Sequence, residues 1–205
     1  MLKISATQLE SYRRYLLDKI SLQQLVDSWT KRTEPSLKMI AGSIFHAKIQ
    51  GMQHEEDERI QFDEQDIIDA RAKVDNRSQI FEYKLRLPID TKHGVVMFTG
   101  VADQIVGNVV HEFKTTYSSF SYDQYCESMQ WRAYSYLFGV EKVQYQVWTL
   151  QEPKGAGEVI RVKDYNSMMM YTNTCTEHEF KSMLEKAVDL MYMLNLQHEE
   201  RLQYA

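Results

Sequence analysis

Two acidic side chains in the segment of residues 99–115 are spaced so that they could share a chemical task. Asp103 and Glu112 lie in two β-rich runs, and the pair Gly107-Asn108 between these runs is a strong signal for a two-residue turn. A tight turn there places Asp103 directly opposite Glu112. Two carboxylates with Cβ atoms about 5 Å apart destabilise a sheet unless a cation lies between them. The predicted occupant is a divalent metal ion, and the alternative is a charged, solvated strand face.

Lys114 follows Glu112 by two residues in the same predicted strand. Because alternate side chains of a strand project from one face, we expect the ammonium group of Lys114 beside the proposed metal ion. A Glu-x-Lys pattern is also common by chance, so this segment alone leaves both interpretations open.

The bulk composition predicts one globular domain. The chain has 205 residues, and its three prolines and eight glycines form no linker, so we expect a single domain over residues 1–205. No apolar run reaches membrane-spanning length, and the first residues lack the apolar core of a signal peptide, which predicts a cytoplasmic protein without membrane association. Two cysteines, Cys126 and Cys175, form no Cys-x-x-Cys pair and support neither a disulfide framework nor a cysteine-built metal site.

Charge is distributed unevenly along the chain. The formal net charge is −5, which argues against indiscriminate binding of polyanions. Residues 1–50 nevertheless hold eight Lys and Arg against four Asp and Glu, whereas residues 51–70, with the run Glu55-Glu56-Asp57-Glu58, hold one Arg against eight acids. A basic N-terminal region fits a phosphate backbone, and ordinary solvated helix faces fit the same charges.

Local signals place helices and strands along the chain. Ser5-x-x-Gln8 is a capping box, Pro35 suits a first helical turn, Pro88 closes a strand and Gly139 ends a helix. We expect helices at residues 5–20, 22–29, 35–52, 64–74, 122–138 and from 176 onward. We expect strands at residues 80–87, 95–106, 109–115, 143–150 and 158–162, with the turn residues Pro153, Gly155 and Gly157 between the last two. Residues 168–170, three methionines, are expected to be packing residues.

Four short motifs follow one another in the sequence. They are Gly42-x-x-x-His46 on a helix, Gly100-x-x-Asp103 and Glu112-Phe113-Lys114 on strands, and Gln130-x-x-x-Tyr134 on a helix. In this order they resemble the RecB-type branch of the PD-(D/E)XK nuclease superfamily, which includes RecE-like and other phage exonucleases. The resemblance covers about residues 5–150, and the opening Ser5-x-Thr7-x-Leu9-x-x-Tyr12 is similar to the start of many such domains. Iron–sulfur members place a cysteine where this chain has Tyr15, so we expect no cluster.

The resemblance implies an α/β fold with a PD-(D/E)XK, restriction-endonuclease-like core. In such a core, a central mixed β-sheet is flanked by helices, here with a helical N-terminal region and a long C-terminal helix. It also implies that Asp103, Glu112 and the carbonyl group of Phe113 hold Mg²⁺ or Mn²⁺, with His46 as a further ligand. Lys114 would position the attacking water, lower its pKa or stabilise the charge of the transition state.

By the same resemblance, Gln130 and Tyr134 would support the site and contact the nucleic-acid strand. Glu82, near the start of the first predicted long strand, is a further acid to test. A glycine one turn before His46 lets that helix approach the sheet, which favours the imidazole as a ligand. Trp131 is expected to be a core residue, and the other histidines are expected to be surface or structural residues.

The resemblance implies a metal-dependent deoxyribonuclease. We expect an exonuclease that processes DNA ends for recombination or repair in a phage or mobile element, with a single-strand annealing protein as a partner and homo-oligomerisation as an option. The alternatives are an endonuclease or nickase on the same fold, and a non-catalytic DNA- or protein-binding subunit of a larger assembly. Loss of Asp103, Glu112 or Lys114 would mark the non-catalytic case, and all three are present.

Overall fold

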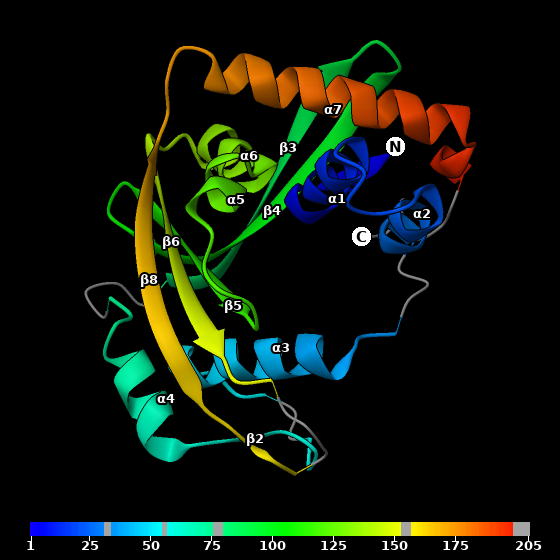
Figure 1. The fold of residues 1–205 in the computed structure, drawn as a ribbon. Helices are drawn as coiled ribbons and strands as arrows, with labels where there is room; N and C mark the ends of the chain where they lie inside the picture. The colour runs from blue at the N-terminus through cyan, green and yellow to red at the C-terminus, as the bar shows by residue number, and fades with distance from the viewer. Residues whose placement is uncertain (31–33, 55–56, 76–79, 153–156, 199–205) are drawn as a thin grey trace.

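The structure is a computed structural model that describes residues 1–30, 34–54, 57–75, 80–152 and 157–198 (Figure 1). The predicted turn residues Pro153 and Gly155 and the acidic residues Glu55 and Glu56 lie outside the described residues. In chain order the elements are β1 (Lys3–Ser5), α1 (Ala6–Leu16), α2 (Leu22–Thr30), α3 (Leu37–Gln50), β2 (Gln61–Phe62), α4 (Glu64–Arg71), β3 (Ile80–Thr91), β4 (Gly94–Val106), β5 (Val109–Thr116), α5 (Tyr122–Cys126), α6 (Met129–Phe138), β6 (Lys142–Leu150), β7 (Val159–Ile160), β8 (Val162–Tyr171), α7 (Thr176–Met193) and the 3-10 helix η1 (Leu196–His198).

A six-stranded mixed sheet forms the centre of the fold. Its order is β1-β4-β5-β6-β8, and β3 pairs with β4 off this path. β3, β4 and β5 form an antiparallel meander, whereas α5 and α6 connect β5 to its parallel neighbour β6. A second, two-stranded sheet joins β2 and β7. The predicted α/β fold, a central mixed sheet with flanking helices and a long C-terminal helix, is confirmed.

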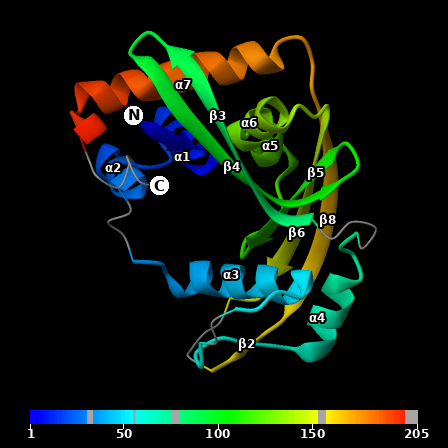
Figure 2. The same ribbon diagram turned by 180° about the vertical axis from the view of Figure 1, so that it is seen from behind.

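Two hydrophobic clusters cover the sheet. The larger cluster contains Leu9 of α1, Phe98 of β4 and Leu184 of α7, and the smaller one contains Phe45 of α3 and Trp148 of β6. Figures 1 and 2 show α1, α6 and α7 on one side of the molecule and α3 and α4 on the other. The catalytic candidates on β4 and β5 therefore lie in strands that are packed from both sides.

β3 does not end at Pro88, as the sequence predicted. It runs to Thr91, and Pro88 is paired in register with Met97 of β4. β4 is the partner of β3 in the sheet, and the other side of β3 has no strand within the described residues. Proline lacks an N–H group and is tolerated on such an edge strand, because the side of β3 that faces away from β4 needs no N–H group to donate to a neighbouring strand.

The helix predicted at residues 122–138 is two helices. α5 ends at Cys126, and α6 begins after Ser128, whose hydroxyl group accepts a hydrogen bond from the N–H of Gln130. The carboxylate of Glu10 also accepts hydrogen bonds from the hydroxyl group of Ser128 (3.1 Å) and the N–H of Met129 (2.8 Å). The break thus anchors α6 to α1, and Gly139 ends α6 in the left-handed conformation (φ 64°) as predicted.

Other boundaries differ from the predictions in smaller ways. The first helix ends at Leu16 and the fourth at Arg71, both earlier than expected. The third helix starts at Leu37 because Ser36, not Pro35, provides its cap. Strands β1, β2 and β8 were not predicted, and the strand expected at residues 158–162 is divided between β7 and β8. Two of the three methionines at 168–170, Met168 and Met170, are buried in the larger cluster, as expected of packing residues.

Candidate active site

The β4–β5 hairpin follows the predicted register and then opens. Gln104 pairs with His111, and the two pairs nearer the turn follow in step, with Gly107 at φ 58°. The main-chain ladder stops one pair before Asp103 and Glu112. There the Oδ2 atom of Asp103 accepts a hydrogen bond from the N–H of Phe113 at 2.5 Å. Asp103 therefore does not form a ladder pair with Glu112, because its carboxylate takes the place of a main-chain acceptor while β5 pairs with β6.

Glu112 is almost completely buried, with 3% of its surface exposed. Its Oε1 atom accepts hydrogen bonds from the ammonium group of Lys114, on the same strand face as predicted, and from the Nε2 atom of Gln130 at 2.8 Å. Its Oε2 atom is buried and has no hydrogen-bond partner. One oxygen of this carboxylate is thus fixed in place, and the other is unused in the structure.

Gln130 and Tyr134 connect Glu112 to the neighbouring strand β4. Gln130 Nε2 also donates to the Tyr134 hydroxyl group at 3.0 Å, which in turn donates to the carbonyl group of Val101 at 2.9 Å. A Cβ atom at Gly100 would lie 2.9 Å from Cε1 of Tyr134 and 2.7 Å from Cδ2 of Leu137, so a glycine is needed for α6 to approach β4. Both Gln130 and Tyr134 are buried, so in this structure they support Glu112, and contact with a nucleic-acid strand stays a prediction.

His46 lies on α3, which approaches β5 closely. A Cβ atom at Gly42 would lie 2.8 Å from Oγ1 of Thr115, which gives the first predicted motif a steric reason. The ring of His46 packs edge-on against Phe113, with the centroids 6.2 Å apart. Its Nε2 atom is buried and has no hydrogen-bond partner. His46 is therefore beside the strand that carries Glu112 and Lys114, with one ring nitrogen available.

Gln50 was not singled out from the sequence. It follows His46 by one helical turn, and its Nε2 atom donates to Oε1 of Glu82 (3.3 Å) and to the carbonyl group of Asp103 (3.2 Å). The spacing of four residues from His46 was the only available signal. Gln50 thus links the side chain of Glu82, the further acid named from the sequence, to the main chain of Asp103 in β4.

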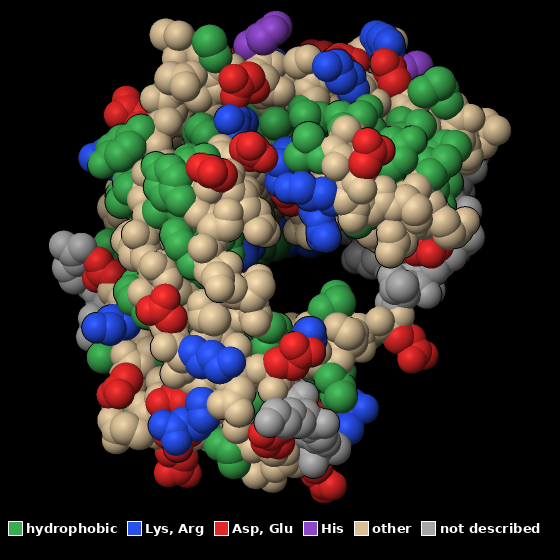
Figure 3. All heavy atoms as spheres, viewed as in Figure 1, with side chains coloured by type: hydrophobic (Ala, Val, Ile, Leu, Met, Phe, Trp, Pro, Cys, Tyr) green, Lys and Arg blue, Asp and Glu red, His purple; other side chains and the backbone are tan. Residues whose placement is uncertain are grey.

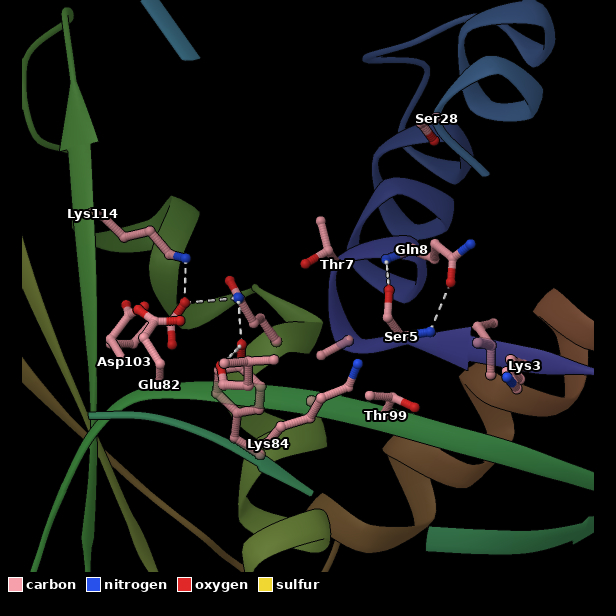
Figure 4. Close-up of a pocket in the computed structure, with 17 residues that line it drawn as sticks. Lys3, Ser5, Thr7, Gln8, Ser28, Glu82, Lys84, Thr99, Asp103 and Lys114 are labelled. Atoms are coloured by element: carbon pink, nitrogen blue, oxygen red, sulfur yellow. Dashed lines mark hydrogen bonds and ion pairs between the residues drawn. The ribbon is translucent and has the colours of Figure 1, made fainter. Parts of the chain in front are cut away.

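The three carboxylates share one cavity of about 460 Å³. Glu82, Asp103 and Glu112 line one part of it, and Figure 4 shows Lys114 reaching toward this group. The first turn of α1 and the side chains of Lys84 and Thr99 line another part. The Oγ1 atom of Thr99 is buried there without a hydrogen-bond partner. The cavity therefore has an acidic part and a part with cationic and hydroxyl groups.

A second cavity of about 530 Å³ adjoins the first and shares Lys114 and Gln130 with it. Its cationic lining side chains are those of Arg13, Arg14, Lys19 and Lys114. Figure 3 shows Lys and Arg side chains gathered at the wall of the hollow in the middle of this face. Glu10 also lines this cavity and pairs with Arg13, so Arg14, Lys19 and Lys114 carry the excess of positive charge there.

Burial shifts the pKa values of the acidic groups upward. It raises the pKa of Asp103 to about 6, against the opposing effects of Lys114 and the Phe113 N–H. Burial and the adjacent Asp103 raise the pKa of Glu112 to about 8, against the opposing effect of Lys114. Partial desolvation and Asp103 also raise the pKa of Glu82, which is an exposed residue of β3. Burial and Lys114 lower the pKa of His46 to about 3, so the imidazole is neutral at pH 7.

The donor atoms suit a hard divalent cation in kind. Carboxylate oxygens and one imidazole are ligands that Mg²⁺ and Mn²⁺ accept, and two of the donor atoms, Glu112 Oε2 and His46 Nε2, are buried without partners. Within the described residues, however, no three His, Cys, Asp or Glu side chains already form a metal-binding group. Binding an ion would therefore require these side chains to move.

Among the other predicted residues, Trp131 is in the core, as expected. His111 is buried against Gln146, and His93 pairs with Asp189 of α7. No helix within the described ranges combines the length and the apolar composition that a bilayer crossing requires.

Comparison with known proteins identifies similar folds. Neither a protein-family model nor a curated protein matches this chain. The crystal structure of SSO0001 has a TM-score of 0.53 and 18% identity, covering 93% of this chain and 77% of the other. The structure of LHK-Exo in complex with dAMP has a TM-score of 0.52 and 13% identity, covering 99% of this chain and 95% of the other. Rai1 from Scheffersomyces stipitis has a TM-score of 0.37 and 10% identity, covering 93% and 61%. The first two likenesses show a shared α/β architecture.

Proposed function

We propose that this protein is a divalent-metal-dependent nuclease of the PD-(D/E)XK type that hydrolyses phosphodiester bonds in DNA. The observation that carries the proposal is the convergence of Asp103, Glu112 and Lys114 in one cavity, with one oxygen of the buried Glu112 left without a partner. An ammonium group beside paired carboxylates, next to a second cationic cavity, suits a substrate with a negatively charged backbone. The shared fold with LHK-Exo, whose structure contains dAMP, is consistent with a deoxynucleotide substrate.

In this proposal the carboxylates of Asp103 and Glu112, the carbonyl group of Phe113 and the imidazole of His46 hold Mg²⁺ or Mn²⁺. The ion, when bound, would supply Lewis-acid polarisation of the phosphate group and a lower pKa for the attacking water. The neutral imidazole of His46 needs to lose no proton before it can act as a ligand. Glu112 and Asp103 do need to be ionised, so binding should improve as pH rises toward 8.

The remaining side chains have separate tasks. Lys114 stabilises the negative charge that develops on the phosphate oxygens, and its contact with Glu112 holds the ammonium group at the cavity. Gln130 fixes Oε1 of Glu112, which leaves Oε2 as the free ligand atom. Tyr134 fixes Gln130 in turn and ties both to β4. Loss of either support should therefore loosen the carboxylate without removing it.

We further propose that the enzyme is an exonuclease that acts on DNA ends during recombination or repair. Incubation with linear, nicked and closed-circular DNA in the presence of Mg²⁺ or Mn²⁺ tests activity and end dependence together. We expect degradation of linear DNA alone, and cleavage of the closed circle would instead indicate an endonuclease.

The matched control for this assay is Glu112→Gln, purified in the same way, because it distinguishes the protein from a contaminating nuclease. Equal activity of the two proteins, or no cleavage with either metal ion, would refute the proposal. The expected partners, a single-strand annealing protein and further copies of the chain, belong to the proposal as well. Gel filtration with and without DNA measures the oligomeric state.

A further inference from the structure

Glu82 has an unusual backbone conformation for a residue inside a strand. Its φ is 49°, in the left-handed region, although it lies within the twelve-residue strand β3. The other non-glycine residues with positive φ in the described part of the chain, Asp18 and Asn195, lie in turns after helices. Left-handed backbone is unfavourable for a residue such as glutamate, and surrounding structure must hold it there.

The register of the sheet places Glu82 in line with the two proposed catalytic carboxylates. β3 pairs with β4 at Phe81–Gln104 and at Tyr83–Ala102, and the intervening position, Glu82 opposite Asp103, is the one that the ladder omits. On the other side of β4, the register of the β4–β5 hairpin leads from Asp103 to Glu112. Glu82, Asp103 and Glu112 therefore form one row across three adjacent strands. The β3–β4 ladder is interrupted between Glu82 and Asp103, and the β4–β5 ladder stops before Asp103 and Glu112.

All three carboxylates reach the same cavity, and they are incompletely neutralised there. Oε1 of Glu112 accepts a hydrogen bond from the ammonium group of Lys114. Oε1 of Glu82 accepts one long hydrogen bond of 3.3 Å from Gln50. Only 3% of the surface of Glu112 is exposed, and its Oε2 atom has no hydrogen-bond partner. Lys3 and Lys84 also line the cavity, but no ion pair joins them to these carboxylates in the described structure. The row therefore has room for a further positive charge.

We propose that Glu82 is a third carboxylate ligand of the divalent metal ion, added to Asp103 and Glu112. This inference rests on the proposed nuclease function. Three carboxylates on three neighbouring strands supply the oxygen-rich environment that Mg²⁺ and Mn²⁺ prefer. Gln50, which donates to both Glu82 and the main chain of Asp103, is the residue that positions Glu82 when no ion is bound.

The test is titration calorimetry of the metal-free protein with MnCl₂, using wild type, Glu82→Gln and Asp90→Asn. Glu82→Gln keeps the size of the side chain and removes its charge. Asp90 is an exposed acid further along the same strand, and it lines neither cavity, so Asp90→Asn controls for loss of one negative charge. We expect Glu82→Gln to weaken Mn²⁺ binding about tenfold or more, and Asp90→Asn to bind as wild type does.

Glu82→Asn provides a second variant, because asparagine tolerates the left-handed backbone better than glutamate. We expect it to lose Mn²⁺ affinity as Glu82→Gln does, while the melting temperature of the metal-free protein rises by about 2–4 °C. This variant gives the binding result if Glu82→Gln does not fold.

Two results would overturn the inference, and they differ from each other. If Glu82→Gln and Glu82→Asn bind Mn²⁺ as tightly as the wild type does, Glu82 is not a ligand, and the proposed function stays intact. No Mn²⁺ or Mg²⁺ binding by the wild type would remove the proposed function and this inference together.

Discussion

The substitution Glu112→Gln should make the metal-free protein less sensitive to rising pH. Glutamine has the shape of glutamate, so its oxygen can still accept hydrogen bonds from Lys114 and Gln130. What it removes is a carboxyl group whose pKa rises from its ordinary value of 4.5 to about 8 on folding, chiefly through burial and then through Asp103. The variant therefore isolates the free-energy cost of ionising Glu112 inside the protein.

The direction of the effect follows from proton counting. Between pH 4.5 and about 8 the unfolded chain has lost the Glu112 proton while the folded protein keeps it. The folded state then binds more protons, so its stability falls as pH rises through this window. The full difference between 4.5 and about 8 corresponds to about 5 kcal/mol. Glu112 titrates together with Asp103 and Lys114, so part of this free energy belongs to those groups. We therefore expect a pH-dependent difference of about 2–3 kcal/mol in the free energy of unfolding between the wild type and Glu112→Gln.

The assay is urea unfolding in EDTA, followed by the fluorescence of the three tryptophans, at several pH values between 4 and 8. We expect the wild type to lose about 2–3 kcal/mol relative to Glu112→Gln across this range, or about 5–10 °C in melting temperature. Glu141→Gln, at an exposed position outside both cavities, should follow the wild type. Saturating Mn²⁺ at pH 8 should stabilise the wild type and not Glu112→Gln.

Parallel pH profiles for the wild type and Glu112→Gln would refute this reasoning. Such a result would mean that Glu112 is ionised and fully compensated by Lys114 in the folded state, with no unmet charge for a metal ion to neutralise. The comparison between variants matters because His46, whose pKa is lowered to about 3, changes stability in the opposite direction below pH 6.5. That contribution is common to both proteins and cancels in the difference.

Substitutions at three further positions test the other parts of the site. His46→Ala should weaken Mn²⁺ affinity about tenfold or more in calorimetry, with partial rescue of cleavage by excess Mn²⁺, and unchanged binding would make His46 a structural residue. Lys114→Ala should lower the single-turnover rate on end-labelled linear DNA about 10²-fold or more, while DNA binding in Ca²⁺ persists. Lys114→Arg should not restore the rate. Near-wild-type cleavage by Lys114→Ala would exclude Lys114 from catalysis. Gly100→Ala should destabilise the protein by about 1–3 kcal/mol in urea unfolding because its methyl group would meet Tyr134 and Leu137, and an unchanged midpoint would show that α6 can retreat without cost.

The features that could be predicted from the sequence are those that depend on neighbouring residues. The capping box forms as expected, since the Ser5 N–H donates to Oε1 of Gln8 at 2.8 Å and the Gln8 N–H donates to Oγ of Ser5 at 3.2 Å. The Gly107-Asn108 turn sets the register of the hairpin for the same reason. Both signals lie within a few residues of the structure they determine, so no tertiary information is required.

The features that were missed depend on residues far apart in the chain. The break before α6 is stabilised by Glu10, which is more than a hundred residues earlier than Ser128. β1 is only three residues long and is defined by its parallel pairing with β4. The first half of β8 is mostly polar after Val162, and the strand has no regular alternation of buried and exposed positions, so the period-two signal of a half-buried strand is absent.

The row of carboxylates shows why a site can be harder to predict than the strands that carry it. Gly107-Asn108 sets the approach of Glu112 to Asp103, but the position of Glu82 depends on the separate pairing of β3 with β4. A slip of β3 by one residue would turn every side chain of that strand to the opposite face. The left-handed conformation of Glu82 occurs at the one position where the β3–β4 ladder is interrupted, with the same register on both sides. The strand thus accommodates an irregular residue without shifting the rest, and this allows an acid on an edge strand to reach the cavity that the hairpin creates.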